Sequence, residues 1–255
     1  MTSSPVVVVV KDAPLLAELV AARLLTRLVD AQALRGRASV VLTGGGTGIA
    51  ALEAVGRSAA RQAVDWRQVD LWWGDERYVA SGDPDRNELQ ARRALLDDLD
   101  LDPARVHPMP ASDGLDGDDV DAAADRYADE LTAAAASDGD VPGFDVLLLG
   151  MGVEGHTASI FPASPAAYDE RIVFGVHGCP KPPPTRISLG FSALNAAREV
   201  WMVVAGRDKA GAVAMALSGA GRVQVPAAGV HGRSATLWLL DEQAAAELPR
   251  ELRRR

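Results

Sequence analysis

Apolar runs alternate with longer amphipathic stretches along these 255 residues, and this alternation limits the possible folds more than any other feature. Phe144–Leu149 is the clearest run, and it suits a strand in a sheet covered on both faces. Other runs indicate strands at Val6–Val10, Ser39–Leu42, Val69–Trp73, Val200–Val204 and Ala235–Leu240. The stretches between them predict helices at Pro14–Leu34, Ile49–Val64, Asn87–Leu99, Asp119–Ala136, Asp208–Leu217 and Glu242–Leu248. We therefore expect an α/β fold, a doubly wound and mostly parallel sheet with helices on both faces.

The chain shows no internal repeat and no linker, so we expect residues 1–255 to form one domain. Its turn-rich stretches, Ala80–Arg86, Pro110–Asp118 and Gly178–Pro184, are too short to separate domains. Val6–Val10 is also too short for a signal core or a transmembrane helix, so we expect a cytoplasmic chain.

Composition excludes several function classes. The net charge of −9 argues against nucleic-acid and anionic-membrane partners, although a local basic site for a small anion remains possible. A single cysteine, Cys179, allows no intrachain disulfide and no cysteine-based zinc site. The four histidines lack the spacing of a zinc hydrolase, so we expect no metal. No G-x-S-x-G sequence marks a serine nucleophile, and Ser159 at an apparent helix start suggests capping or packing.

The first chemical motif, Thr43-Gly44-Gly45-Gly46-Thr47-Gly48, joins a predicted strand to a predicted helix. Glycines let the backbone approach a ligand closely, and a helix N-terminus favours anions. The spacing matches neither the Walker loop nor the dinucleotide fingerprint. The motif indicates a phosphate site, or a glycine-rich turn without a ligand.

Two further motifs follow strands, where the carboxyl ends of a parallel sheet bind ligands. Trp73-Gly74-Asp75-Glu76-Arg77 offers two carboxylates and a guanidinium, either as a site or as a surface ion-pair cluster. Gly150-Met151-Gly152-Val153-Glu154-Gly155-His156 surrounds one histidine with glycines. Because an imidazole titrates near neutral pH, His156 is a candidate proton carrier, with helix capping as the alternative. His107, His177 and His231 have no comparable surroundings and are expected to be structural or exposed.

Cations beyond strand ends form the last candidate set. Arg186 follows the proline-rich loop, and Lys209 lies in Gly206-Arg207-Asp208-Lys209. They either complete a phosphate site or are ordinary solvent-exposed cations.

Taken in order, these motifs resemble those of bacterial-type 6-phosphogluconolactonases. The resemblance rests on the glycine loop, on Trp73–Arg77 with Asn87, on Gly150–Ser159 with Phe161-Pro162, and on Arg186-Ile187-Ser188. It runs from about residue 38 to 210 and implies a Rossmann-like fold shared with glucosamine-6-phosphate deaminase and ribose-5-phosphate isomerase. It departs from the family pattern at Gly46, Gly48, Ala80, Arg86 and Val153-Glu154, which leaves the role of Glu154 open.

The resemblance implies an activity and a set of roles. The activity is hydrolysis of 6-phospho-D-glucono-1,5-lactone to 6-phospho-D-gluconate in the oxidative pentose phosphate pathway, without metal or organic cofactor. His156 is the expected general base, and Asp75 is expected to hold His156 or Arg77. Arg77 and backbone N–H groups around Gly152 are the expected oxyanion donors, although Arg77 could face the phosphate instead. The expected phosphate ligands are Gly44, Gly45, Gly46, Thr47, Arg186 and Lys209.

Two rival functions remain. Deaminases of the same fold carry a glutamate where this chain has Phe161, and Asp-Glu-Tyr where it has Asp75-Glu76-Arg77. Sugar-phosphate sensors of related fold need a DNA-binding segment, and the chain has no spare helix-turn-helix region. We expect a small-molecule sugar-phosphate lactone as partner, and either a monomer or a small homo-oligomer.

Overall fold

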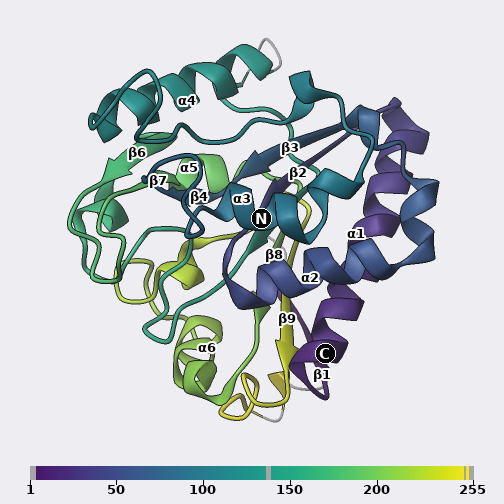
Figure 1. Cartoon of the computed structure of the whole chain (residues 1–255). Coiled ribbons are helices and arrows are strands. Elements are labelled where there is room, and N and C mark those ends of the chain that lie inside the picture. The colour runs from purple at the N-terminus through teal and green to yellow at the C-terminus, as the bar shows by residue number, and fades with distance from the viewer. Residues whose placement is uncertain (1–3, 136–138, 250, 253–255) are drawn as a thin grey trace.

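The computed structural model describes residues 4–135, 139–249 and 251–252, and a six-stranded parallel sheet forms its centre (Figure 1). The strand order is β1-β9-β8-β5-β2-β3. The strands are β1 (Val6–Val10), β2 (Ala38–Leu42), β3 (Val69–Trp73), β5 (Val146–Leu149), β8 (Glu199–Val204) and β9 (Ala235–Asp241). All residues of β2, β5 and β8 are buried, as expected of strands covered on both faces.

Helices cover both faces of this sheet. They are α1 (Ala13–Arg35), α2 (Gly45–Arg57), α3 (Asn87–Ala94), α4 (Val120–Ala134), α5 (Phe191–Leu194) and α6 (Ala210–Leu217). The chain moves toward β3 through α1 and α2, then reverses toward β1 through the later connections. Because such crossovers are right-handed, the reversal places α4 and α6 on the face opposite α1 and α2, as Figure 1 shows. The expected doubly wound α/β fold is confirmed.

The long helix α1 shows how local sequence sets element boundaries. The Asp12 carboxylate accepts a hydrogen bond from Leu15 N at 3.0 Å and caps the first turn. Pro14 follows within that first turn, where its missing N–H costs nothing. Gly36 ends the helix with a φ of 74°, a conformation that side chains disfavour.

A second, three-stranded sheet was missed from the sequence. It consists of β4 (Asp75–Arg77), β6 (Val173–Val176) and β7 (Arg186–Leu189), paired antiparallel in the order β4-β7-β6. These strands have three or four residues each, too few to show a strand period. Two residues expected in loops, Asp75 and Arg186, therefore lie on strands.

Several predicted helices differ from the structure. α2 begins at Gly45, inside the predicted glycine loop, and a 3₁₀ segment follows it at Ala59–Ala63. α3 is shorter than predicted and continues as a 3₁₀ turn at Leu96–Asp98. The helix predicted at Glu242–Leu248 is wrong, because that segment forms consecutive turns. Ala136, the predicted end of α4, lies outside the described residues.

Other 3₁₀ segments lie at Trp66–Gln68, Pro103–Arg105, Pro165–Tyr168, Arg207–Lys209 and Pro226–Gly229. Among the residues that the structure describes, no helix is both long enough and apolar enough to span a bilayer.

Candidate active site

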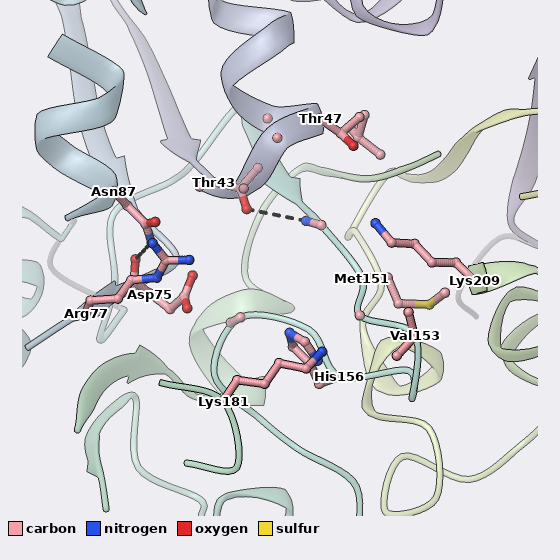
Figure 2. A pocket seen from close by; sticks show the side chains of 18 of the residues that line it. Thr43, Thr47, Asp75, Arg77, Asn87, Met151, Val153, His156, Lys181 and Lys209 are labelled. Carbon is pink, nitrogen blue, oxygen red and sulfur yellow. Dashed lines mark hydrogen bonds between the residues drawn. The ribbon is translucent and has the colours of Figure 1, made fainter. Parts of the chain in front are cut away.

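The candidate site lies where the strand order reverses, at the carboxyl ends of the neighbouring strands β2 and β5. At such a point the loops that follow the two strands separate and leave a crevice. A pocket occupies this crevice, and Figure 2 shows most of its lining side chains. Its lining includes all the predicted site residues: Gly44, Gly45, Gly46, Thr47, Asp75, Arg77, Gly152, His156, Arg186 and Lys209.

The glycine loop supplies the N-terminus of α2 to this pocket. Gly44 is the N-cap, and no side chain caps the helix there. The first N–H groups of a helix have no partner within the helix and carry partial positive charge, so this end suits a phosphate. A Cβ on Gly44 would lie 1.9 Å from Oδ1 of Asn87, so only glycine fits beside that amide.

Two predicted phosphate ligands reach the pocket in different ways. Lys209 extends into it from the connection after β8, on the side away from Asp75 and Arg77 (Figure 2). Arg186 is only 5% exposed and already donates from Nε to the carbonyl of Pro183. Its Nη2 donates to the carbonyls of Lys181 and Pro182 at 3.0 and 3.2 Å. Arg186 therefore fixes the proline-rich loop as well as lining the pocket.

Asp75 and Arg77 enter from β4, and their contacts differ from those expected. Asp75 Oδ2 accepts a hydrogen bond from the Ser159 hydroxyl at 2.7 Å. The charge of Asp75 also raises the pKa of His156, and its expected role in holding His156 or Arg77 stays a prediction. Ser159 is wholly buried and begins no helix, so of its two predicted roles packing agrees with the structure and capping does not.

Arg77 and Asn87 present polar atoms that a ligand can use. Arg77 Nη1 donates to the carbonyl of Asp85 at 2.5 Å, and Asn87 Nδ2 donates to the carbonyl of Asp75 at 2.8 Å. Within the described residues, Nε of Arg77 and Oδ1 of Asn87 are buried without a hydrogen-bond partner. Buried polar atoms of this kind favour a bound group that satisfies them.

Glu76 serves the structure beside the pocket. Its carboxylate is wholly buried and accepts the backbone N–H groups of Arg77, Asn87 and Glu88 at 2.7–2.9 Å. These bonds tie β4 to the first turn of α3. Burial raises the Glu76 pKa to about 7, against the opposing effects of Arg86 and of the N–H donors. The surface ion-pair alternative for this motif does not hold.

His156 is held in a close-fitting space. Its ring stacks on Phe161 with centroids 4.2 Å apart and an interplanar angle of 20°. A Cβ on Gly152 would lie 2.0 Å from Nδ1 of His156, so glycine is required there. Burial lowers the pKa of His156 below its ordinary value of 6.5, although the charges of Glu154 and Asp75 oppose this. The imidazole is therefore neutral at pH 7 and able to accept a proton.

One expectation about Gly152 is corrected. Its N–H donates to the carbonyl of His156 at 3.0 Å, because the loop turns back on itself there. That group is therefore not available as an oxyanion donor. Gly152 contributes space for the histidine ring instead.

Two residues beside His156 were not predicted as site residues. Oε2 of Glu154 lies 3.2 Å from Nδ1 of His156 and accepts a hydrogen bond from Nζ of Lys181 at 3.0 Å. Lys181 comes from the proline-rich loop and extends alongside His156 (Figure 2). A lysine among prolines has no local signal that could have identified it. Glu154 lay within a quoted motif, but its spacing alone assigned no role.

The remaining histidines, His107, His177 and His231, do not line this pocket. His107 stacks on Trp72, and His177 lies on the surface beside Asp121. Among residues 4–135, 139–249 and 251–252, no cluster of three or more metal-ligating side chains is found.

A parallel sheet with an uncapped helix N-terminus and a largely buried histidine at its reversal point is typical of α/β proteins that bind small anionic ligands. A family model described as glucosamine-6-phosphate isomerases/6-phosphogluconolactonase matches residues 11–238. The chain belongs to this family.

Individual relatives agree with the family assignment. The chain is 59% identical to a 6-phosphogluconolactonase from Streptomyces coelicolor over 255 residues, 99% of this chain and 98% of the relative. It is 52% identical to one from Mycobacterium tuberculosis over 239 residues, 93% of this chain and 96% of the relative. A 6-phosphogluconolactonase structure from Trypanosoma brucei superposes with a TM-score of 0.84 at 26% identity, covering 98% of this chain and all of that one.

The fold is also similar to that of a protein with lower sequence identity. A monomeric glucosamine-6-phosphate deaminase structure matches with a TM-score of 0.78 at 19% identity, covering 94% of this chain and 99% of that chain. The likeness to that fold was predicted from the sequence and is confirmed.

Proposed function

We propose that this chain hydrolyses 6-phospho-D-glucono-1,5-lactone to 6-phospho-D-gluconate, with His156 as general base. The observation that carries the proposal is a largely buried imidazole in the same pocket as a helix N-terminus suited to phosphate. The relatives from Streptomyces coelicolor and Mycobacterium tuberculosis, both named 6-phosphogluconolactonase, support the same activity.

In the proposed mechanism, the phosphate binds at the N-terminus of α2 with Lys209 and Arg186 nearby. This anchor fixes the lactone carbonyl beside His156, and binding energy remote from the reaction thereby serves orientation. The separation of Lys209 from Arg77 in Figure 2 favours Arg77 at the sugar end. Arg77 then stabilises the oxyanion, a contribution of about 3–4 kcal/mol for one such donor.

In the proposed reaction, one side chain of this protein carries out both proton transfers. His156 accepts a proton from water as the water oxygen attacks the lactone carbon, and a tetrahedral oxyanion forms. The oxyanion collapses, the bond to the ring oxygen breaks, and His156 returns the proton to that oxygen. General catalysis of this kind contributes about 10²–10⁴-fold.

The apolar ring beside His156 favours lactone hydrolysis over deamination of an amino-sugar phosphate. Phe161 offers a flat hydrocarbon face to the imidazole at the position where the deaminases carry a glutamate. Ester hydrolysis requires a single proton carrier that acts twice, which the site supplies.

A coupled assay tests the proposal. Glucose-6-phosphate dehydrogenase generates the lactone, this protein is added, and 6-phosphogluconate is followed with its own dehydrogenase. We expect turnover above the spontaneous background and a loss of at least about 10²-fold in kcat for His156→Ala. A folded wild-type protein that gives only the background rate would show that the proposed function is wrong. Turnover that survives in His156→Ala would show that another group is the base.

A further inference from the structure

Three charged or titratable side chains from two separate loops, those of Lys181, Glu154 and His156, lie in a row beside the pocket. Nζ of Lys181 and Nδ1 of His156 both approach the same oxygen of Glu154, at 3.0 and 3.2 Å. Glu154 and His156 belong to the loop after β5, whereas Lys181 belongs to the loop before β7. The contact therefore joins two segments that are 27 residues apart in the chain.

Hydrogen bonds from Arg186 hold the backbone at Lys181 in place. Arg186 is almost wholly buried and holds the carbonyls of residues 181, 182 and 183 through three hydrogen bonds. This fixes the backbone from which the Lys181 side chain extends. The other two members both pack against Gly152, where an added Cβ would lie 2.0 Å from Nδ1 of His156 and 2.5 Å from Oε2 of Glu154.

We propose that Lys181 and Glu154 are positioning residues for His156: Glu154 orients the imidazole with its proton on Nδ1, and Lys181 offsets the charge of Glu154 so that the imidazole stays neutral. This inference rests on the proposed role of His156 as general base. Among the residues that the structure describes, Nδ1 of His156 is buried without a hydrogen-bond partner and lies 3.2 Å from Oε2 of Glu154, so the carboxylate favours a proton on Nδ1 and leaves Nε2 as the basic nitrogen. Without Lys181, the carboxylate alone would favour the imidazolium, and a protonated histidine cannot accept a proton from water.

Glu154 and Lys181 shift the pKa of His156 in opposite directions. Glu154 and Asp75 raise the pKa of His156, and Lys181 lowers it. Lys181 and His156 in turn help to hold the pKa of Glu154 below its ordinary value, although burial acts the other way. Asp75 faces the ring from β4, the other lining cations are Arg77, Arg186 and Lys209, and Phe161 carries no charge.

The direct test is an NMR titration of the imidazole Cε1–H signals, which needs no catalytic activity. His156→Asn identifies the signal of His156 among the four histidines. Lys181→Met should raise the pKa of His156 by about half a pH unit, because a cation near the ring is lost while part of the effect is screened by solvent. Glu154→Gln should lower it, and Lys181→Arg should restore the wild-type value because it keeps the charge.

Kinetics provide the second readout. The acid limb of kcat/KM should move to higher pH in Lys181→Met, giving about threefold lower activity at any pH below the limb. It should move to lower pH in Glu154→Gln, with a lower plateau because the Nδ1 proton loses its partner. A structural role for the pair would lower the plateau in both variants without moving the two limbs in opposite directions.

A matched pair elsewhere in the chain serves as control. Nε2 of His177 lies 3.0 Å from Oδ2 of Asp121 on the surface, away from this pocket. Asp121→Asn should leave the pKa of His156 and the turnover rate as they are.

The outcomes separate the two proposals. If neither Lys181→Met nor Glu154→Gln moves the pKa of His156, or if both move it in the same direction, the inference is overturned whatever the turnover rate. If the wild-type protein shows no lactone turnover but the titrations shift with the expected signs, the proposed function fails and the electrostatic coupling of the three residues stands.

Discussion

Replacing Gly152 with alanine gives a sharp test of how the loop after β5 places the proposed base. The added Cβ would lie 2.0 Å from Nδ1 of His156, 2.1 Å from its Cε1 and 2.5 Å from Oε2 of Glu154. Ordinary contact begins at about 3.4 Å, so the imidazole must move by about 1.4 Å. Because a misplacement of about 1 Å costs on the order of 10²-fold, we expect kcat to fall by about 10²-fold or more.

The same change should also cost stability. The shift disturbs the stack of His156 on Phe161, a contact worth about 0.5–1.5 kcal/mol, and adding a methyl group to this close-fitting space costs about 1–3 kcal/mol. Coupled turnover measures kcat, and denaturant unfolding measures the free energy of unfolding. Gly143→Ala is the control, since its Cβ meets nothing within 4 Å. A kcat for Gly152→Ala within threefold of wild type would refute the account of how His156 is positioned.

Other residues give separate predictions. Lys209→Met should raise KM by about tenfold with little change in kcat, since a charge-assisted contact to phosphate is lost, and steady-state kinetics check this. Glu76→Gln should cost about 1–3 kcal/mol of unfolding free energy, because one N–H in the β4–α3 junction loses its acceptor. Burial raises the pKa of Glu76 in the folded protein from 4.5 to about 7. The stabilisation linked to its protonated form is therefore complete below about pH 4.5 and is lost as the pH rises through 7. The glutamine variant should therefore lack this pH dependence in denaturant melts. Ser159→Ala should cost about 1–3 kcal/mol of unfolding free energy by leaving the buried Asp75 carboxylate without its hydroxyl donor, and denaturant unfolding checks this.

Much of the fold was predictable because hydrophobic period is a local signal. β5 and β8 are buried on both faces, so they appear in the sequence as nearly continuous apolar runs. Parallel connections then place the ends of these strands at one edge of the sheet, and this gathers motifs that follow different strands. For this reason the glycine loop, Asp75, Arg77 and His156 could be expected in one pocket before the structure was known.

The contacts that orient the site were not predictable in the same way. Ser159 reaches Asp75 across 84 residues of sequence, and Lys181 reaches Glu154 across 27. Each contact depends on the small sheet β4-β7-β6, whose short strands show no period. The role of Arg186 in fixing the proline-rich loop also depends on tertiary structure. The sequence around an arginine does not show whether its guanidinium binds backbone carbonyls or a phosphate.

The glycines of the site show how local and tertiary information combine. From the sequence alone they indicated close approach of backbone to ligand. At Gly46 an added Cβ meets nothing within 4 Å, so no protein contact requires glycine there and close approach to a ligand stays the prediction. Gly44 and Gly152 have a different reason, since a Cβ there would overlap Asn87 and His156. In these two positions the missing side chain makes room for a functional group from α3 or from the same loop. Glycine-rich motifs of this kind therefore specify where the polar side chains lie as much as where the ligand binds.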